Sequence, residues 1–505
     1  MTERIFVDTD DIIILDEDRK DVNKVRRDIY RGLNGEEAEV AICVWMYTPN
    51  RLEKLRNCID SIMKYTKHIK FKLVLTNNGG GKEIEEYYES IDYSDKMIID
   101  ISTNISSPHG LSVIQRYVKN KFCVEVLNDC IVTENWLDNM LRCINSDESI
   151  GMVVPMSTNT SNMQEPCTGN IDLRNHNEIQ NFAKTYNISD PLKWEQRMRL
   201  MPICGLYRRE TLEVAGISDQ GYLHEFADDD HCMRIRRAGY KLMLCGDTVV
   251  HHDHFMDERN QLLEQLNTNI GRNGYINKFK GLDPWLDFGN FVFPYLSDIK
   301  LDNKKDKYKI LGIDVKCGTP ILDVKNLYRK NGIEMSRINT TAYTQEIKYY
   351  TDLLTVSDYV IHNDINMVNN EIEGKYDFII IGECLNNYSK PILHLERIVN
   401  KLEDGGYLMF FLKNINNVNT LLNVIGERRI DGVEEVVMLY YWDVVSKLKE
   451  MNIKQIKLFT EKYTSMKDEI ETIKESMIRL GIVSEYNKSV TNEWDVYRYC
   501  FLIQK

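Results

Sequence analysis

Continuous runs of apolar residues alternate, along the first half of the chain, with stretches that carry apolar residues on one helical face. Residues 40–46 and 71–75 are such runs, and a polar turn follows each of them, at 48–50 and at 76–81. Short uninterrupted apolar runs are typical of strands buried on both faces of a sheet. Leucine and isoleucine recur at helical spacing in residues 52–62, between the two runs. This βαβα order predicts a parallel sheet with a ligand site beyond the carboxyl ends of its strands.

A third apolar run, at residues 122–127, ends in Asn128 and Asp129 and leads into a further helix near Trp136. The carboxyl ends of parallel strands meet at one edge of a sheet. The end of this strand therefore places an acid at the edge where a ligand is expected.

A second alternation of strands and helices follows a charged tract at residues 302–307. A helix-like stretch covers residues 392–402, and Gly405 and Gly406 indicate a turn between it and the strand after it. The strand-like runs of this part lie at 308–315, 376–381 and 407–412. The pattern predicts a second α/β domain.

The length of 505 residues exceeds what one hydrophobic core serves, so three ordinary domains or two large ones are expected. We expect an appended, charge-rich segment with a helical stretch around residues 22–30, followed by two α/β domains. Their expected bounds are 1–38 for the segment, 39–300 for the first domain and 301–505 for the second.

Charge and hydropathy exclude some classes of protein. A formal net charge of −13 disfavours a nucleic-acid binder, because such proteins need a basic surface. No apolar run approaches the roughly 20 residues that span a bilayer, and residues 1–11 are acidic where a signal peptide is basic. We therefore expect a cytoplasmic protein without integral membrane association. The twelve cysteines form no Cys-x-x-Cys pair, which indicates buried thiols rather than a cysteine zinc site or a disulfide framework.

Acids and histidines are unusually dense in one segment. Three acids at residues 228–230 are followed by His251, His252 and His254 within about one supersecondary unit. Acids are normally spread to limit their repulsion, so this density indicates a cation site or a proton-transfer site. The alternative is a helix cap, because carboxylates accept the free amide groups of a first helical turn. We expect that role for Asp229 or Asp230, and both interpretations stay open for Asp228.

The polar motifs at the strand ends occur in a characteristic order. They are a loop with Thr48, Asn50 and Arg51, a loop with Asn77 and Asn78, a strand end with Asn128 and Asp129, the segment 227–234 followed by Gly239 and Tyr240, and a strand end with His251 and His252. In this order they resemble a family 2 glycosyltransferase with a GT-A fold, which is a Rossmann-like nucleotide-sugar domain. The resemblance spans about residues 40–285, and it implies an enzyme that transfers a sugar from a nucleotide sugar.

The resemblance implies that the first two of these loops contact the nucleotide of the donor. Asn77 stands where the family usually has Asp. An amide also hydrogen-bonds a uracil edge, so this departure weakens the choice of nucleotide more than it weakens the fold. The donor that the resemblance implies is a UDP-sugar.

The resemblance also implies a metal ion on the donor diphosphate. Asp129 occupies the last acid of the family's Asp-x-Asp motif, Leu127 stands where its first acid would be, and Asn128 lies between them. His251 aligns best with the histidine that completes the metal site and His252 next, and the choice between them stays open. Such a shell of oxygen ligands and one imidazole suits Mn²⁺ or Mg²⁺ better than zinc. With only two protein ligands, the ion should bind weakly without the donor.

Asp228 stands at the family's catalytic Asp, and Ala227 at the position of its Glu. Sugar transfer with inversion needs one base that takes the acceptor proton, and the resemblance gives this role to Asp228. Asp229 and Asp230 raise its pKa by like-charge repulsion if they point the same way. His254 is expected beside the metal site or on the surface.

Residues 155–164 and 273–279 are similar to segments of bacterial glycosyltransferases that modify flagellin. They imply a protein acceptor, with N-acetylglucosamine from its UDP form as the leading candidate for the sugar placed on Ser or Thr. The first alternative is a glycosyltransferase that builds a cell-surface polysaccharide or a lipid-linked glycan. The second is a non-catalytic nucleotide-sugar-binding scaffold, because Asn77, Leu127 and Ala227 depart from family acids.

The second half of the chain, from about residue 308, resembles a class I methyltransferase on its first strand, on the strand at 376–381 and on Gly405 and Gly406. Its cofactor loop departs from the family, because Lys316 and Pro320 stand where glycines let the backbone approach S-adenosylmethionine. The acid that should hold the ribose is not evident in residues 336–340. We therefore expect a degenerate domain that binds no S-adenosylmethionine and holds the protein acceptor or a partner.

Overall fold

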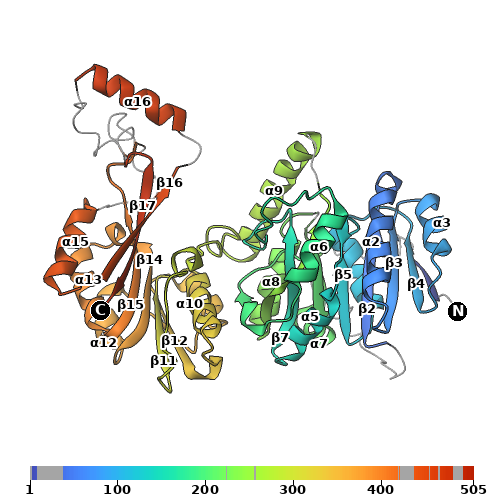
Figure 1. Cartoon of the computed structure of the whole chain (residues 1–505), viewed down its shortest axis with the longest axis horizontal. Helices are drawn as coiled ribbons and strands as arrows, with labels where there is room; N and C mark the ends of the chain where they lie inside the picture. Colours follow the sequence, from blue (N-terminus) through green and yellow to red (C-terminus); the bar gives the residue numbers. More distant parts are fainter. Residues whose placement is uncertain are drawn as a thin grey trace. The chain divides into compact units, whose positions relative to one another are not determined.

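The computed structural model describes residues 3–7, 38–222, 224–254, 258–418, 420, 437–453, 455–463, 467–481 and 493–505. The chain divides into two compact units, residues 1–289 and 290–505 (Figure 1). The helical stretch predicted around residues 22–30 lies outside the described residues.

The first unit is built on a ten-stranded sheet, counted over its described residues. The strands follow the order β1-β4-β3-β2-β5-β9-β7-β10-β6, and β8 pairs with β10. Their bounds are Glu3–Val7 (β1), Val40–Met46 (β2), Phe71–Asn78 (β3), Lys96–Ile101 (β4), Phe122–Val126 (β5), Cys130–Ile131 (β6), Ile150–Thr158 (β7), Trp194–Arg197 (β8), Cys204–Arg208 (β9) and Lys241–His252 (β10).

Strand directions bring several carboxyl ends to one edge of this sheet. β1, β4, β3, β2 and β5 are mutually parallel. β9 is antiparallel to both β5 and β7, so β7 runs in the direction of β5, and β10 is parallel to β7. The carboxyl ends of β2, β3, β5 and β10 therefore lie at the same edge.

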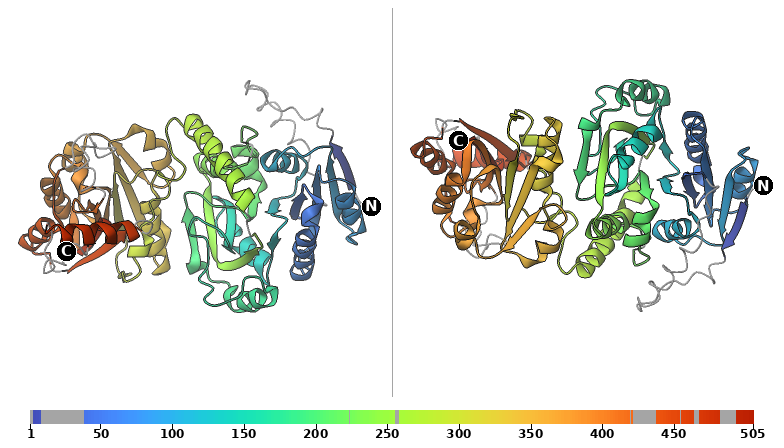
Figure 2. Two further views of the ribbon diagram at one scale, coloured as in Figure 1. Left: turned by 90° about the horizontal axis from the view of Figure 1, so that it is seen from above. Right: turned by 90° about the horizontal axis from the view of Figure 1, so that it is seen from below.

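Helices cover both faces of the sheet (Figure 2). Side chains alternate along β2: Ile42 and Val44 pack into the core beneath α2, α3 and α5, whereas Ala41 and Cys43 pack into the core beneath α4, α7 and α8. Burial on both faces explains why this strand is one continuous apolar run. The bounds are Leu52–Tyr65 (α2), Lys82–Ser90 (α3), Ser107–Tyr117 (α4), Trp136–Asn145 (α5), His176–Tyr186 (α6), Arg209–Ala215 (α7), Ala227–Arg237 (α8) and Glu258–Lys278 (α9), with 3₁₀ turns at Pro49–Arg51 (η3) and Pro191–Lys193 (η4).

Residues 3–7, expected in an appended segment, are the edge strand β1 of this sheet. Their backbone pairs in parallel with β4. Arg4 adds ion pairs to Asp100 at 2.9 Å and to Glu85 and Glu89 at 2.5 Å each. The start of the chain is thus part of the first unit.

The second unit has a seven-stranded sheet, again counted over described residues, in the order β13-β12-β11-β14-β15-β17-β16. Its first five strands along the chain are parallel and follow the doubly wound order 3-2-1-4-5. β17 is antiparallel to β15 and to β16. The strand bounds are Tyr308–Ile313 (β11), Ile338–Thr344 (β12), Tyr359–His362 (β13), Tyr376–Cys384 (β14), Leu402–Lys413 (β15), Gln455–Lys462 (β16) and Val496–Gln504 (β17).

The helices of this unit connect its parallel strands and flank its last two. Their bounds are Thr319–Lys330 (α10), Tyr350–Leu353 (α11), Val368–Glu371 (α12), Pro391–Asn400 (α13), Tyr441–Glu450 (α15) and Lys467–Arg479 (α16), with 3₁₀ turns at Phe293–Tyr295 (η5), Met335–Arg337 (η6), Ile347–Tyr349 (η7), Ile365–Met367 (η8) and Leu385–Asn387 (η9). The prediction of two successive Rossmann-like α/β domains is confirmed.

Two local predictions differ from the structure. The division falls between Gly289 and Asn290 rather than near residue 300, because the Val292 and Phe293 amides donate to the Asp323 carboxylate at 2.6 and 3.1 Å within the second unit. The glycine pair predicted as a helix-to-strand turn lies inside β15. Gly405 has φ +80°, and the pairing of β15 with β14 is irregular near there.

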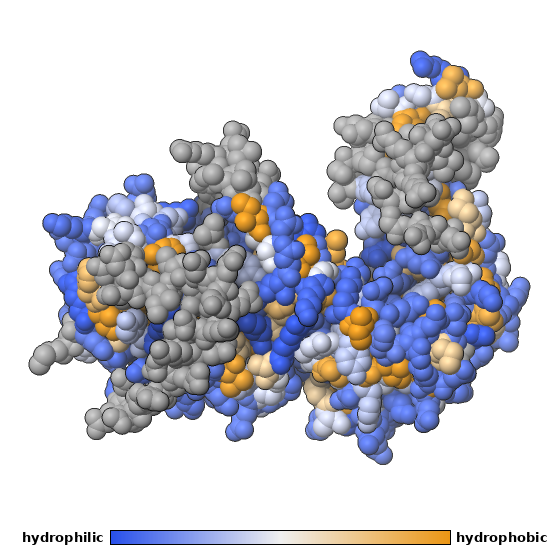
Figure 3. All heavy atoms as spheres, turned by 180° about the vertical axis from the view of Figure 1, so that it is seen from behind, coloured by the Kyte–Doolittle hydropathy of each residue, from blue (hydrophilic) through white to orange (hydrophobic). Residues whose placement is uncertain are grey.

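The surface and the thiols agree with their sequence patterns. Among the described residues, every helix is too short or too polar to cross a bilayer. The face drawn in Figure 3 is hydrophilic over most of its described area, with hydrophobic residues scattered between. All cysteines except Cys167 are buried, and none is in a disulfide.

Candidate functional site

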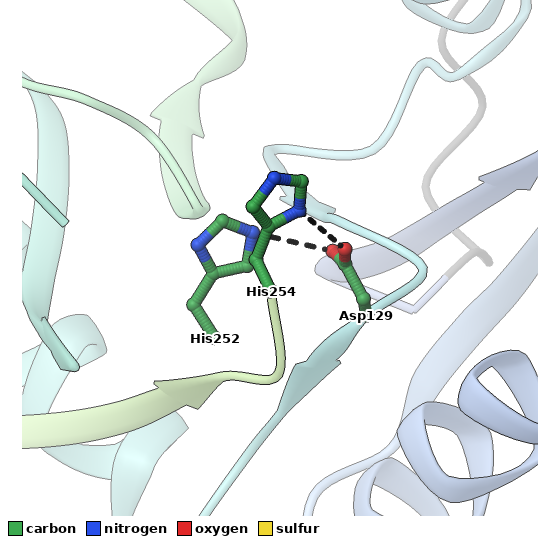
Figure 4. Close-up of side chains that lie close together, drawn as sticks. All are labelled: Asp129, His252 and His254. Atoms are coloured by element: carbon green, nitrogen blue, oxygen red, sulfur yellow. Dashed lines mark hydrogen bonds and ion pairs between the residues drawn. The ribbon is translucent and has the colours of Figure 1, made fainter. Parts of the chain in front are cut away.

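The Asp129 carboxylate faces two neighbouring imidazoles, those of His252 and His254, at the carboxyl edge of the first sheet (Figure 4). Asp129 follows β5 and is only 4% exposed. Its Oδ1 lies 3.4 Å from Nε2 of His252, and its Oδ2 lies 3.3 Å from Nδ1 of His254. The strand register explains why Asp129 lies close to His252: β6 pairs with the end of β10 and places Cys130, the neighbour of Asp129, opposite His252. The Asp253 amide also donates to the Asp129 carbonyl oxygen at 2.8 Å.

Hydrogen bonding fixes which nitrogen of His252 faces this acid. Nδ1 of His252 donates to the carbonyl oxygen of Asn159 at 3.1 Å, which leaves a lone pair on Nε2 directed at a carboxylate. Nε2 is buried and has no hydrogen-bond partner among the described residues. Two facing lone pairs repel, and either a proton or a metal cation between them removes the conflict.

The donor set suits a divalent ion. One carboxylate and two imidazoles, those of Asp129, His252 and His254, place their ligand atoms within 4.8 Å of one another. Oδ1 of Asn128 is a further buried oxygen without a partner in the described chain, while its Nδ2 donates to the Trp45 carbonyl oxygen at 3.0 Å. These orphaned buried atoms fit a bound cation.

The neighbours of Asp129 stabilise its charge. Burial opposes ionisation, but the imidazoles of His252 and His254, at 3.4 and 3.3 Å from its oxygens, outweigh burial and hold the pKa of Asp129 well below its usual value. Arg51 adds a guanidinium nitrogen 3.5 Å from Oδ2. Asp129 is therefore a charged acceptor, as a metal ligand must be.

His251 belongs to a second cluster. Its ligand atom lies within 4.8 Å of those of His176 and Asp253, and its Nδ1 is 2.6 Å from Oγ1 of Thr158. Burial, followed by the neighbouring histidines His176 and His252, lowers the pKa of His251 to about 4. The structure thus groups Asp129 with His252 and with His254, which had been expected beside the site, and not with His251.

The three acids of α8 have different surroundings. The residue that caps this helix is Phe226, with φ +69° and no side-chain cap, so the prediction that Asp229 or Asp230 caps it is wrong. Asp229 instead pairs with Arg199 at 2.9 Å. Asp230, fully buried, pairs with Arg234 at 2.6 Å and with a lysine, Lys278. Arginine and lysine bind these carboxylates more strongly than the amides of the helix start.

Asp228 is the third acid of α8 and takes part in neither of these ion pairs. It is half-buried and has no ion-pair partner among the described residues. Burial, and then the neighbouring charge of Asp229, raise the pKa of Asp228 to about 7. A carboxylate with this pKa takes and releases protons near neutral pH, as a general base must.

Topology places Asp228 at the sheet edge that carries the Asp129 cluster. α8 leads directly into β10 and packs against it, so the start of α8 lies toward the end of β10, where His252 stands. The turns after β2 and β3 share that edge. Thr48 and Arg51 follow β2, and Asn77 and Asn78 end β3.

The residues of these two turns mainly bond the turns themselves. Oγ1 of Thr48 accepts from the Asn50 amide at 3.4 Å. Oδ1 of Asn77 accepts from the Gly80 amide at 2.8 Å, and its Nδ2 donates to Asp100 at 3.3 Å. Asp100 at the end of β4 thus supplies an acid beside Asn77, which the sequence analysis missed although it also marks a strand end.

Asn78 is also engaged by the chain. Its Nδ2 donates to the Ser106 carbonyl oxygen at 3.0 Å, and its Oδ1 accepts from the Ile105 amide at 3.2 Å. The side chain is 1% exposed. Asn78 is therefore a buried residue that ties the end of β3 to the backbone of residues 105 and 106.

The loop after β11, where the sequence resemblance implied a cofactor site, is packed against its own unit. The Asp314 carboxylate accepts from the Gln345 amide, from its side chain and from the Tyr388 hydroxyl, each at 2.9 Å. A Cβ at Gly382 would lie 2.5 Å from the Asp314 carbonyl oxygen, so β14 lies directly against the loop. Lys316 holds φ +53° where a glycine would be unstrained. The loop after β11 is thus held by hydrogen bonds to the end of β12 and to the turn after β14, with Lys316 in a conformation that favours glycine.

The acid sought in residues 336–340 is found further along. That stretch is the 3₁₀ turn η6 and the start of β12, and the strand ends at Thr344. Glu346 follows it and is exposed. The residues 336–340 therefore lie at the start of this strand, and the first acid after its end is Glu346.

The sequence matches no protein-family profile and no curated protein. Among solved structures, GalNAc-T7 with UDP, GalNAc and Mn²⁺ is similar at 14% identity and a TM-score of 0.35, over 44% of this chain and 45% of that one. A Pyrobaculum calidifontis mannosyltransferase in complex with GDP-Man and Mn²⁺ is similar at 14% identity and a TM-score of 0.33, over 56% of this chain and 72% of that one. A SAM-dependent methyltransferase from Archaeoglobus fulgidus is similar at 13% identity and a TM-score of 0.27, over 49% of this chain and all of that one. The chain thus spans less than half the length of the first of these proteins.

Proposed function

We propose that this chain is a bacterial, cytoplasmic, metal-dependent inverting glycosyltransferase. It moves a sugar, with N-acetylglucosamine as the first candidate, from a UDP-sugar to Ser or Thr of a protein acceptor such as flagellin. One observation carries the proposal: Asp228, with its raised pKa and without an ion-pair partner among the residues described, lies at the same sheet edge as the Asp129 cluster. A base and a cation site at one edge are the two elements that inverting sugar transfer needs.

Asp228 takes the proton of the acceptor hydroxyl. Asp229 and Asp230 are held by Arg199 and Arg234, so neither competes for this role. Desolvation keeps the Asp228 carboxylate basic enough to accept a proton near pH 7.

Asp129, His252 and His254 would hold the metal ion, Mn²⁺ or Mg²⁺. When bound there, such an ion neutralises the charge that develops on the departing diphosphate. Nδ1 of His252 is already fixed by the Asn159 carbonyl oxygen, so Nε2 is the ligand atom. Three protein ligands leave positions for donor oxygens, so we expect nucleotide to tighten metal binding.

The remaining elements have supporting roles in the proposal. Thr48, Asn50 and Arg51 after β2, Asn77 and Asn78 at the end of β3, and Asn128 beside the acid line the donor site. The second unit binds the acceptor protein or a partner, and it transfers no methyl group.

Intact-mass analysis of flagellin tests the whole proposal. The purified chain is incubated with flagellin, Mn²⁺ and individual UDP-sugars, and the expected result is a mass increase of one or more sugar residues. Transfer to a polysaccharide or a lipid-linked acceptor, with flagellin unchanged, would support the glycan-building alternative. Absence of turnover with every donor and acceptor, while UDP binds, would support the scaffold.

The Asp228→Asn variant is the matched control in this assay. It keeps the size of the side chain and removes its basicity. Transfer that persists unchanged in this variant would contradict the assignment of the base.

A further inference from the structure

A second group of metal-type ligands lies in the first unit, beside the Asp129 cluster but composed of other residues. His251 is the next-to-last residue of β10, and Asp253 directly follows that strand. His176 is the first residue of α6. Their ligand atoms all lie within 4.8 Å of one another. The His176 and His251 rings are 5.9 Å apart between centroids, tilted by 57°.

The ring nitrogen of His251 that is left unsatisfied within the described chain is an independent sign that a ligand binds at this cluster. The side chain is completely buried, at 0% exposure. Its Nδ1 is bonded to the Thr158 hydroxyl at 2.6 Å, whereas its Nε2 has no hydrogen-bond partner among the described residues. A buried ring nitrogen is normally satisfied, and a histidine whose Nδ1 is held in this way presents Nε2 to a metal ion.

The donor set has the same composition as that of the Asp129 cluster, and the complete burial of His251 is what distinguishes this site. Two imidazoles and one carboxylate are a usual three-ligand set for Zn²⁺, with water in the fourth position. Zinc–ligand distances of about 2.0–2.2 Å place tetrahedral ligand atoms roughly 3.3–3.5 Å apart, so small side-chain rotations are enough to close this group. Lys54 lies 3.7 Å from Oδ2 of Asp253, so this carboxylate would be shared between Lys54 and the proposed ion.

We propose that His176, His251 and Asp253 bind a zinc ion that is distinct from the donor metal. Its effect follows from connectivity, because His252 lies between the ligands His251 and Asp253, and His254 follows Asp253. Asp253 also donates its amide to the Asp129 carbonyl oxygen at 2.8 Å. A zinc ion bound here would therefore position the residues of the Asp129 cluster.

The experiment measures zinc binding to the full chain after chelator treatment, in the absence of any nucleotide. Calorimetry gives affinity and stoichiometry, and Co²⁺ substitution gives the visible absorption of the site. The variants are His176→Gln and Asp253→Asn in the second cluster and His254→Gln in the first. His68→Gln is the matched control, because His68 is exposed and pairs with Asp138 at 2.8 Å.

We expect wild type, His68→Gln and His254→Gln to bind one zinc ion with similar affinity. His176→Gln and Asp253→Asn should lose about tenfold or more in affinity and should change the Co²⁺ spectrum. Neither variant replaces the buried His251, and their circular dichroism checks that they fold.

Unchanged affinity and an unchanged Co²⁺ spectrum in His176→Gln would overturn the proposal. So would loss of the zinc ion in His254→Gln alone, because the ion would then belong to the Asp129 cluster. The measurement needs neither donor nor acceptor, so failure of sugar transfer leaves it standing. Conversely, failure to bind zinc leaves the assignment of Asp228 and Asp129 untouched.

Discussion

Replacing Asp228 by Asn is the sharpest perturbation of the proposed chemistry. The amide keeps the size of the side chain but accepts no proton at neutral pH. Because Asp228 has no ion-pair partner among the described residues, the substitution breaks no ion pair, and we expect the melting temperature to change little. Loss of a general base lowers kcat by about 10²–10⁴-fold. At 1.36 kcal/mol for each factor of ten, this is about 3–5 kcal/mol of transition-state stabilisation.

The pH dependence follows from the same residue. Burial and the charge of Asp229 raise the pKa of Asp228 to about 7, and the base works only when it is deprotonated. Wild-type kcat should therefore be level above that pH and should fall by up to tenfold per unit below it. Asp229→Asn removes the neighbouring negative charge, which lowers the pKa of Asp228 and moves the acidic limb to lower pH.

UDP release, checked by the intact mass of the acceptor, is measured from about pH 5 to pH 9. Asp92→Asn is a control, because Asp92 is exposed and precedes β4 at the opposite edge of the sheet. The assignment of the base would be refuted if Asp228→Asn kept more than about a tenth of wild-type kcat. An acidic limb that does not move in Asp229→Asn would refute the electrostatic part of the argument.

Three further predictions follow from particular contacts. His252→Ala and His254→Ala should each weaken Mn²⁺ binding in the presence of UDP by about tenfold or more in calorimetry, and equal affinities would exclude them as ligands. S-adenosylmethionine should show no binding in calorimetry, because Lys316 and the packed Asp314 occupy its loop; micromolar affinity would contradict this. Trp136→Ala should lower the free energy of unfolding by about 3–5 kcal/mol in a denaturant titration, since this fully buried side chain also donates to Thr66 at 3.1 Å. A loss below about 1 kcal/mol would show that the core around it collapses to fill the space.

The central strands could be predicted because burial on both faces leaves no ambiguity in their pattern. Ala41 and Ile42 face different cores, so β2 can be predicted from its apolar run without knowing the strand register. The register does decide between His251 and His252, because successive strand residues point to opposite faces. The pairing of β10 with β7 shifts register between Cys245 and Val249, so faces cannot be counted from the start of the strand.

Contacts between distant parts of the chain were also beyond the sequence pattern. His176 meets His251 only because α6 packs against β10. Glu346 was missed because residues 335–337 form a 3₁₀ turn, which moves the end of β12 beyond the residues where an acid was sought. Asp229 and Asp230 pair with Arg199 and Arg234, whose positions depend on tertiary packing, whereas Asp228 has no ion-pair partner within the described part of the chain.

The edge strand β1 has a practical consequence for work with this protein. It covers the side of β4, and Arg4 ties it to two glutamates of α3 and to Asp100. A truncated chain that begins near residue 38 would leave the backbone amide and carbonyl groups of β4 unpaired along an open sheet edge. Such an edge recruits strands from other molecules, so a version trimmed to the obvious domain start should aggregate where the full chain stays dispersed.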